Sequence, residues 1–403
     1  MGNIYDELGV SPVLNGRGNQ TLLGGSTVSP FVRKCMDEAE EDYVDMGNLA
    51  DAVGNRIADL LGVEAALVTS GAAAALAVAA AACMTGSDEK KIERIPDTHG
   101  MPNEIVIQKL GRQRYDRSMT IPGGKMVEVG TTEGTHPKQI EEAIGPNTAA
   151  IHHTAAYDDL PGILPLREII RIGHAHDIPI IVDAAGQVYP TENLSKYAKM
   201  GADLVAYGAK YFGSVNSSGM LTGKKEMITA ARMNSFIGFE ASAARSFSRP
   251  MKLDRQEIVA VYAALREWLT MNHEDRFASY EARMKVLREE LRGIEGIIPM
   301  LPEEWPNRMA DGSFLIEGGN RFSPQAPYEQ LMVVVDRSKT GKKASDILAE
   351  LEAGNPSIKL RPAEGSLGRL LENDPYGDYF NIRISTLKEG SEKVIAKRIR
   401  DIL

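Results

Sequence analysis

Three short segments of the sequence combine residue types that could do chemistry together, and each follows a run of apolar residues. Asp183 ends the most apolar run of the chain, and Lys210 follows a later one. Ser70, Gly71 and Ala72 follow an earlier run and open an alanine-rich stretch. A desolvated lysine loses its proton readily, and a buried carboxylate needs a compensating partner. A helix that begins in a small loop offers free N–H groups to an anion.

Each segment also has an ordinary structural explanation. Ser70 could cap its helix, Asp183 could cap the next turn, and Lys210 could lie in solvent. The order of the three segments argues against these explanations, because a phosphate-type helix start, a strand-end Asp and then a strand-end Lys are typical of fold-type I pyridoxal-phosphate (PLP) enzymes. We therefore predict that Lys210 forms a Schiff base with PLP and that Asp183 pairs with its ring nitrogen. Ala185 is small enough for a flat ring to lie against it.

The elements that must position these residues alternate between apolar runs and amphipathic stretches. Amphipathic stretches occur at Pro137–Ile144 and Leu166–His176. This alternation predicts βαβ units, with a mostly parallel sheet covered by helices on both faces. Such sheets bind ligands at the carboxyl ends of their strands, where the three segments fall. The candidate strands are Ala65–Thr69, Glu104–Gln108, Lys125–Val129, Thr148–His152, Ile178–Asp183, Asp203–Tyr207 and Gly219–Thr222.

The pattern changes after residue 252 and predicts a second, smaller α+β domain. A long helical stretch from Leu253 to Arg292, with a weak point near Asn272, resembles a connector. Residues 1–60 form an N-terminal segment that either completes the small domain or covers the active site of another subunit. The predicted boundaries are 61–252 for the large PLP-binding domain, 253–292 for the connector and 293–403 for the small domain. Its expected strands are Gln330–Asp336, Ile358–Arg361 and Phe380–Ser385, and its expected helices are Lys342–Ala353 and Ser391–Leu403.

Composition excludes several classes of protein. The net charge of -9 over 403 residues disfavours a nucleic-acid partner, since phosphate binding depends on clustered Lys and Arg. The two cysteines, Cys35 and Cys83, predict neither a disulfide framework nor a zinc site, and no metal is expected. No apolar run reaches the roughly 18 residues that a membrane span needs, and the N-terminus does not read as a signal peptide. A cytoplasmic enzyme is the expectation.

The sequence resembles the selenocysteine-synthase-like group of fold-type I PLP enzymes over nearly its whole length. The resemblance implies an aspartate aminotransferase-like large domain, PLP as the cofactor, and the roles given above for Lys210, Asp183 and the Ser70–Ala72 loop. Within the group, the chain is most similar to ammonia lyases of amino-sugar acids. The resembling segments include GVSPVLNGRGNQTLLGGS, IADLLGVEAALVTSGAAAALAVAAA, IPIIVDAAGQVYP, ADLVAYGAKYFGSVNSSGMLTGKKE and NIRIS.

The chain departs from the group around the lysine. Related sequences often carry Ser-Gly-Gly or Ser-Gly-Asp before it, whereas Tyr207-Gly208-Ala209 precedes Lys210 here. The missing serine removes an expected phosphate contact, which leaves open whether the Tyr207 hydroxyl replaces it. The run from Gly213 to Asn216 also differs, and this bears on the identity of the substrate.

Several cationic and amide side chains are candidates for binding a substrate. Arg383 lies on a late strand where fold-type I enzymes often bind the substrate carboxylate, and a surface salt bridge is the alternative. Asn15 and Arg17 belong to a glycine-rich segment that either forms only a turn or covers the site. Arg112 is a candidate for a substrate phosphate. Weaker candidates for that phosphate, or for stacking on the ring, are Arg114 and His99.

The resemblance implies β-elimination from a small 2-amino-3-hydroxy acid, which yields a 2-oxo acid and ammonia. The alternatives are a transferase that acts on seryl-tRNA, a racemase or aldolase, and a PLP-binding protein without catalytic activity. The acidic composition argues against the tRNA substrate. We expect a homodimer or higher homo-oligomer, no membrane partner and no nucleic-acid partner.

Overall fold

The protein was analysed as a computed structural model, which describes residues 4–242, 244–304, 314–315, 321–322, 329–363 and 378–403. The chain divides into two compact units. The larger unit is continuous and comprises residues 26–271, and the smaller one combines residues 1–25 with residues 272–403. Each unit is described by itself.

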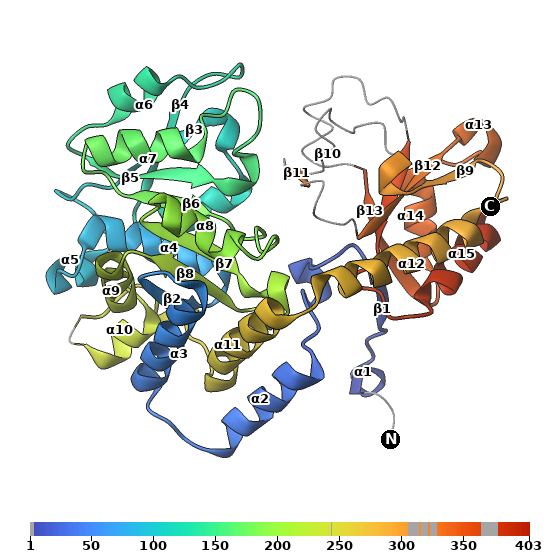
Figure 1. The fold of residues 1–403 in the computed structure, drawn as a ribbon, viewed down its shortest axis with the longest axis horizontal. Helices are drawn as coiled ribbons and strands as arrows, with labels where there is room; N and C mark the ends of the chain where they lie inside the picture. The colour runs from blue at the N-terminus through green and yellow to red at the C-terminus, as the bar shows by residue number, and fades with distance from the viewer. Residues whose placement is uncertain (1–3, 243, 305–313, 316–320, 323–328, 364–377) are drawn as a thin grey trace. The chain divides into compact units, whose positions relative to one another are not determined.

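A seven-stranded sheet, with the strand order β2-β8-β7-β6-β5-β3-β4, forms the centre of the larger unit (Figure 1). β8 pairs antiparallel with both of its neighbours, and the other pairs in this sheet are parallel. The predicted mostly parallel α/β architecture is confirmed. The strands are β2 (Ala65–Thr69), β3 (Glu104–Gln108), β4 (Lys125–Val129), β5 (Thr148–Thr154), β6 (Ile180–Asp183), β7 (Leu204–Gly208) and β8 (Gly219–Gly223).

Helices cover both faces of this sheet because successive strand residues point to opposite sides. On one face, Leu67, Ile105 and Ile181 pack in a cluster with α4 (Gly71–Thr85) and α9 (Lys225–Met233). α4 is apolar on all sides and its many alanines allow a close approach to the strands. Among the described residues, no helix combines the length and apolarity that a membrane span requires.

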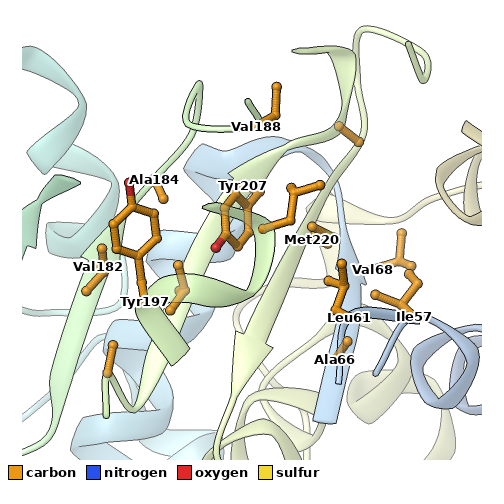
Figure 2. Close-up of a cluster of buried hydrophobic side chains, with 14 of the residues drawn as sticks. Ile57, Leu61, Ala66, Val68, Val182, Ala184, Val188, Tyr197, Tyr207 and Met220 are labelled. Carbon is orange, nitrogen blue, oxygen red and sulfur yellow. The ribbon is translucent and has the colours of Figure 1, made fainter. Parts of the chain in front are cut away.

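The opposite face packs against α3 (Met46–Leu61), α7 (Leu166–Ala175), α8 (Asn193–Met200) and α11 (Arg255–Thr270). Figure 2 shows part of this cluster, in which Tyr207 lies among Val182, Tyr197 and Met220. Other helices of the larger unit are α2 (Pro30–Glu41), α5 (Glu89–Arg94), α6 (Pro137–Ala143) and α10 (Phe236–Ala241). Its short 3-10 turns are η2 (Lys109–Gly111), η3 (Arg114–Thr120), η4 (Ala155–Tyr157), η5 (Ala209–Phe212) and η6 (Arg249–Met251).

The smaller unit contains a five-stranded sheet with the order β1-β13-β14-β12-β9 and its own apolar core. The N-terminal strand β1 (Val13–Gly16) pairs in parallel with β13 (Ser357–Pro362), and the other pairs are antiparallel. Its other strands are β9 (Ile297–Met300), β12 (Gln330–Val335), β14 (Tyr379–Arg383) and the separate pair β10 (Phe314–Leu315) and β11 (Arg321–Phe322). Its helices and turns are α1 (Ile4–Glu7), η1 (Thr21–Leu23), α12 (His273–Leu291), η7 (Pro302–Glu304), α13 (Arg337–Thr340), α14 (Ala344–Ala353) and α15 (Ser391–Ile402).

The two units divide the chain at other places than the predicted boundaries. Within the segment predicted at 1–60, residues 1–25 join the smaller unit and residues 26–60, which form α2 and α3, join the larger one. α2 packs on α11 and α3 packs on β2, which explains this assignment. The connector predicted at 253–292 breaks at Asn272, which caps α12, so that α11 and α12 fall in different units.

At Gly54, α3 approaches the backbone of β2 closely. A Cβ at this position would overlap the carbonyl oxygen of Ala66 in β2. Alanine favours a helix over glycine by about 1 kcal/mol, but overpacking against backbone costs about 1–3 kcal/mol, so the clash should dominate. We therefore expect Gly54→Ala to lower the melting temperature of the cofactor-free protein. Gly145→Ala is the control, because nothing lies within 4 Å of a Cβ there. Equal melting temperatures for both variants would contradict the close packing.

Candidate active site

Lys210 lies in η5, directly after β7 and at the carboxyl edge of the larger sheet. The backbone N–H of Ala209 donates to the carbonyl oxygen of Ser218 over 3.0 Å, which ties this turn to the start of β8. The ammonium lies 5.3 Å from the centre of the Tyr211 ring. Partial burial lowers the pKa of Lys210 below its ordinary value, because it disfavours the charged form. The Lys210 amine therefore becomes neutral and nucleophilic at a lower pH than the amine of an exposed lysine does.

Asp183 is the last residue of β6, which lies between β5 and β7, and its side chain is buried. One carboxylate oxygen accepts a hydrogen bond from the backbone N–H of Ala185 at 2.9 Å. Asp183 therefore does cap the turn that follows β6, as its ordinary structural explanation expects. The other carboxylate oxygen accepts from the side-chain amide of Gln113 at 2.6 Å. Burial raises the pKa of Asp183, and these two hydrogen bonds oppose that rise. Among the ion pairs of the described residues, none involves this carboxylate.

The Ser70–Ala72 loop forms the N-terminus of α4. Ser70 precedes the helix without a side-chain capping bond, so its hydroxyl does not satisfy the first N–H groups of α4. Gly71 has a φ of 86°, a left-handed conformation that favours glycine. The free N–H groups and the positive end of the helix dipole together suit a phosphate.

The antiparallel strand β8 brings the phosphate-type loop and the lysine turn together. Its first residue, Gly219, pairs with Thr69 of β2 on one side and with Gly208 of β7 on the other. A Cβ on Gly219 would lie 2.5 Å from the carbonyl carbon of Gly71, so only glycine fits between the two loops. On the next strand, Asp183 pairs in register with Ala206 of β7. All three predicted segments of the larger unit therefore lie along one stretch of the sheet edge.

The Tyr207 hydroxyl does not replace the serine that related sequences carry there. The side chain is fully buried in the core, and its hydroxyl donates to the carbonyl oxygen of Asn193 at 2.8 Å. Burial raises the pKa of this hydroxyl. Tyr207 therefore acts as a packing residue beneath the sheet edge.

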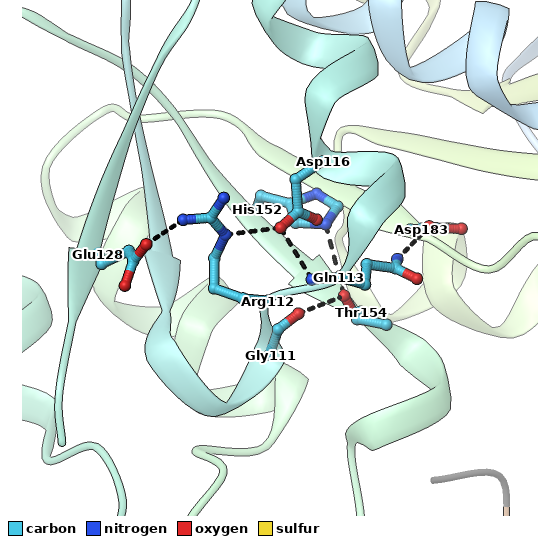
Figure 3. Close-up of polar contacts among 8 residues, drawn as sticks. All are labelled: Gly111, Arg112, Gln113, Asp116, Glu128, His152, Thr154 and Asp183. Atoms are coloured by element: carbon cyan, nitrogen blue, oxygen red, sulfur yellow. Dashed lines mark hydrogen bonds and ion pairs between the residues drawn. The ribbon is translucent and has the colours of Figure 1, made fainter. Parts of the chain in front are cut away.

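Gln113 is a contact of Asp183 that the sequence reasoning missed, although its neighbours Arg112 and Arg114 were considered. Figure 3 shows the amide of Gln113 directed at Asp183. The only sequence signal is its position five residues after the end of β3, at the same edge of the sheet. Arg114 is exposed and hydrogen-bonds Tyr115. His99 precedes β3 and therefore lies at the opposite edge of the sheet from Lys210.

Arg112 is already paired with carboxylates. Its Nε donates to Asp116 at 2.6 Å, and one of its terminal nitrogens contacts Glu128. Asp116 is buried, and this burial raises its pKa while the Arg112 guanidinium opposes the rise. Arg112 therefore compensates a buried acid, and a substrate phosphate would have to compete with two carboxylates for it.

The remaining candidates, Asn15, Arg17 and Arg383, belong to the smaller unit. Arg17 donates to the carbonyl oxygen of Leu360 at 2.7 Å and pairs with Glu352 at 3.2 Å. The Asn15 side chain bonds the backbone of Arg17 and Gly18, and so shapes the turn after β1.

Arg383 ends β14 and lies against this turn. A Cβ on Gly18 would lie 2.6 Å from its Cδ, so the glycine permits the close approach. One guanidinium nitrogen pairs with Glu329 at 3.1 Å, and the side chain is 15% exposed. Its Nε is buried and has no hydrogen-bond partner among the described residues. That unused donor suits an additional anionic acceptor, such as a carboxylate.

The larger unit fits PLP on three observations. Asp183 is a buried carboxylate that lacks a cation among the described ion pairs, as expected if a protonated ring nitrogen supplies one. Lys210 is a lysine with a lowered pKa at the neighbouring strand end. The N-terminus of α4 offers N–H groups to the cofactor phosphate without a capping side chain.

Comparison with known proteins agrees with this arrangement. Residues 33–294 match the family described as SelA: L-seryl-tRNA selenium transferase. A 5'-C-glycyluridine monooxygenase-decarboxylase from Streptomyces sp is 31% identical over 99% of this chain and 92% of its own length. A D-glucosaminate-6-phosphate ammonia lyase from Salmonella typhimurium is 28% identical over 99% of this chain and 98% of its own. A solved structure of D-glucosaminate-6-phosphate ammonia-lyase has a TM-score of 0.80 at 26% identity and covers 100% of this chain and 98% of that one.

The first test of the site concerns Lys210, the lysine predicted to carry the cofactor. Because burial lowers the pKa of Lys210, we expect borohydride to fix PLP on this residue, with loss of the label in Lys210→Ala. Lys224 provides the control, since its ammonium pairs with Asp203 at 2.6 Å and its pKa is raised. Peptide mapping by mass spectrometry measures the label. Label on Lys224 or Lys252 instead would overturn the assignment.

The second test concerns Asp183 and the dependence of stability on pH. Its raised pKa means that the ionised carboxylate destabilises the folded, cofactor-free protein above that pKa. Asp183→Asn should therefore raise the melting temperature of the cofactor-free protein at pH 7, and the gain should shrink as the pH falls toward 3.8, the ordinary value. The same variant should weaken PLP binding by roughly tenfold or more, because it loses a hydrogen bond between charged groups.

Asp158 is the matched control for this experiment. It lies in the same unit, and its contact with His153 Nε2 at 2.9 Å, together with the hydrogen bond that it accepts from the backbone N–H of Leu166, lowers its pKa despite burial. Asp158→Asn should therefore lower the melting temperature at pH 7. If both variants shift the melting temperature in the same direction, the account of Asp183 as an uncompensated charge is wrong.

Proposed function

The chain belongs to the L-seryl-tRNA selenium transferase (SelA) family of PLP enzymes, and we propose that it is an ammonia lyase for D-glucosaminate 6-phosphate. The products would be 2-keto-3-deoxygluconate 6-phosphate and ammonia, because the water lost in the elimination is taken up again on hydrolysis. The observation that carries the proposal is the likeness to D-glucosaminate-6-phosphate ammonia lyase, which extends over the full length in both sequence and structure.

The proposed chemistry divides among a few side chains. Bound PLP supplies an electron sink for negative charge at the substrate's α-carbon. Lys210, whose amine is easily deprotonated, removes the α-proton as general base. The Asp183 carboxylate holds a proton at the ring nitrogen, and the N-terminus of α4 binds the cofactor phosphate. The later loss of the 3-hydroxyl makes the overall change a β-elimination.

Arg383 is the proposed site for the substrate carboxylate. Its buried Nε lacks a hydrogen-bond partner among the described residues. The ion pair with Glu329 compensates only part of the positive charge of the guanidinium. The substrate phosphate is assigned to Arg112 or Arg17, with Asn15 shaping the turn beside Arg17. Both arginines have carboxylate partners in the described structure, so binding of the phosphate requires exchange of an ion pair.

A second candidate is the activity named for the Streptomyces relative, which is slightly more similar in sequence. A monooxygenase-decarboxylase would use the same lysine and aspartate but would lose CO2 and consume O2. The family's seryl-tRNA reaction is less well supported, because the chain carries a net charge of -9.

One assay separates these functions. The PLP-loaded protein is incubated with glucosaminate 6-phosphate, 5'-C-glycyluridine or D-serine, while ammonia, CO2 and O2 are measured with and without air. The proposal requires ammonia release from the phosphosugar acid that does not depend on O2. Release of CO2 with O2 uptake from the glycyl nucleoside would favour the second candidate, and turnover of D-serine at the same rate as the phosphosugar acid would refute the substrate assignment.

The arginine that binds the phosphate can be identified from a ratio. For wild type, Arg112→Gln and Arg17→Gln, we compare kcat/KM for glucosaminate 6-phosphate with kcat/KM for unphosphorylated glucosaminate. Loss of a charge-assisted phosphate contact should reduce only the phosphorylated substrate's value, by roughly 10- to 150-fold. A purely structural arginine lowers both values equally and leaves the ratio unchanged. Arg171→Gln, at an exposed pair with Glu168, is the control.

A further inference from the structure

The side-chain amide of Gln113 contacts the Asp183 carboxylate, and the reaction proposed above assigns no role to this contact. Its Nε2 donates to Asp183 Oδ2 at 2.6 Å across 70 positions of sequence. The other carboxylate oxygen accepts from Ala185 N at 2.9 Å. With one donor on each oxygen, rotation about the bond that joins the carboxylate to its Cβ would break both hydrogen bonds. The carboxylate plane is therefore set by Gln113 and by the backbone.

We propose that Gln113 is a positioning residue that fixes the orientation of the Asp183 carboxylate and so keeps the proton on the ring nitrogen of bound PLP. The inference rests on the proposed use of PLP at this site, and it does not depend on which substrate is turned over. An N–H donor at this atom favours the ionised carboxylate, because a protonated carboxyl oxygen accepts hydrogen bonds poorly. Burial raises the pKa of Asp183, and the Gln113 amide opposes that rise.

Gln113 is itself held in place by a buried acid. Its backbone N–H donates to Asp116 Oδ2 at 2.9 Å, and the Nε of Arg112 donates to the same oxygen at 2.6 Å. Figure 3 shows Arg112 extending from this acid to Glu128 on β4. The backbone conformation of residues 112–116 is therefore fixed by a single carboxylate that is 1% exposed.

A second anchor reaches the same loop from the strand beside Asp183. Thr154 pairs in register with Asp183, and its hydroxyl donates to the carbonyl oxygen of Gly111 at 3.1 Å. The loop that presents Gln113 is thus attached on one side to Asp116 and on the other to β5. These two attachments fix the backbone from which the Gln113 amide reaches Asp183.

The experiment removes the donor while keeping the volume of the side chain. Gln113→Met lacks the amide but has a similar length and shape. Three quantities are measured on the full chain: the Kd of PLP by titration, the 15N chemical shift of PLP labelled at the ring nitrogen, and the melting temperature without cofactor. We expect the Kd to rise roughly tenfold or more, and the 15N shift to move toward that of a neutral pyridine.

Gln256→Met is the matched control. The Gln256 amide also donates to a carboxylate, that of Glu40 at 2.7 Å, in the same unit but on α11 and α2. This variant should leave both the Kd and the 15N shift unchanged. If Gln113→Met does not fold, Gln113→Asn keeps an amide that is one methylene shorter, and it should show the same two changes.

The possible outcomes separate this inference from the proposed function. A lower melting temperature with an unchanged Kd and 15N shift would show that Gln113 only stabilises the loop, and the inference would be overturned. Failure of the wild type to bind PLP would instead refute the proposed function, and with it the inference. Normal PLP binding without any ammonia release would refute the lyase assignment and leave the role of Gln113 to be decided by the two cofactor measurements.

Discussion

The proposed site depends on one physical constraint, the burial of the Asp183 carboxylate. A carboxylate at the end of a central strand loses its hydration, and the two neutral donors that it receives do not replace a cation. The folded chain therefore keeps an acid that would be more stable as an amide until a positively charged group binds. The surrounding contacts, from Gln113 to the buried Asp116, hold this acid in one orientation.

The one antiparallel strand of the larger sheet, β8, brings the other two predicted segments of the site together. β8 lies between β2 and β7, so its first residue, Gly219, lies against both the N-terminus of α4 and Gly208, which directly precedes the turn that carries Lys210. In an all-parallel sheet the starts of strands lie at the opposite edge from their neighbours' ends. The antiparallel direction thus places a glycine at the edge where the predicted anion-binding loop and the predicted Schiff-base lysine meet, and only glycine, which lacks a Cβ, fits there.

The sequence predicted the strands of the larger sheet well because buried parallel strands are continuous apolar runs between polar turns. β2, β3 and β4 have the predicted bounds, and the predicted weak point near Asn272 coincides with the residue that caps α12. The contact of Gln113 with Asp183 could not be predicted, because a side-chain hydrogen bond between distant loops leaves no periodic signal. The ion pairs of Arg112 with Glu128 and of Arg17 with Glu352 could not be predicted for the same reason, since each partner lies on a distant element. The sequence did not assign residues 26–60 to the large domain, because it does not reveal that α2 packs on α11 and that α3 packs on β2.

The parallel pairing of β1 with β13 has a consequence for the order in which the protein is made. Val13 and Ser357 are neighbours in the smaller sheet, so β1 has no strand to pair with until most of the chain has left the ribosome. The larger unit is a continuous segment, residues 26–271, and can complete its core while the remainder is still being synthesised. The smaller unit then closes around a strand that is translated before the larger unit and is incorporated after it, so its formation requires the closure of a long loop.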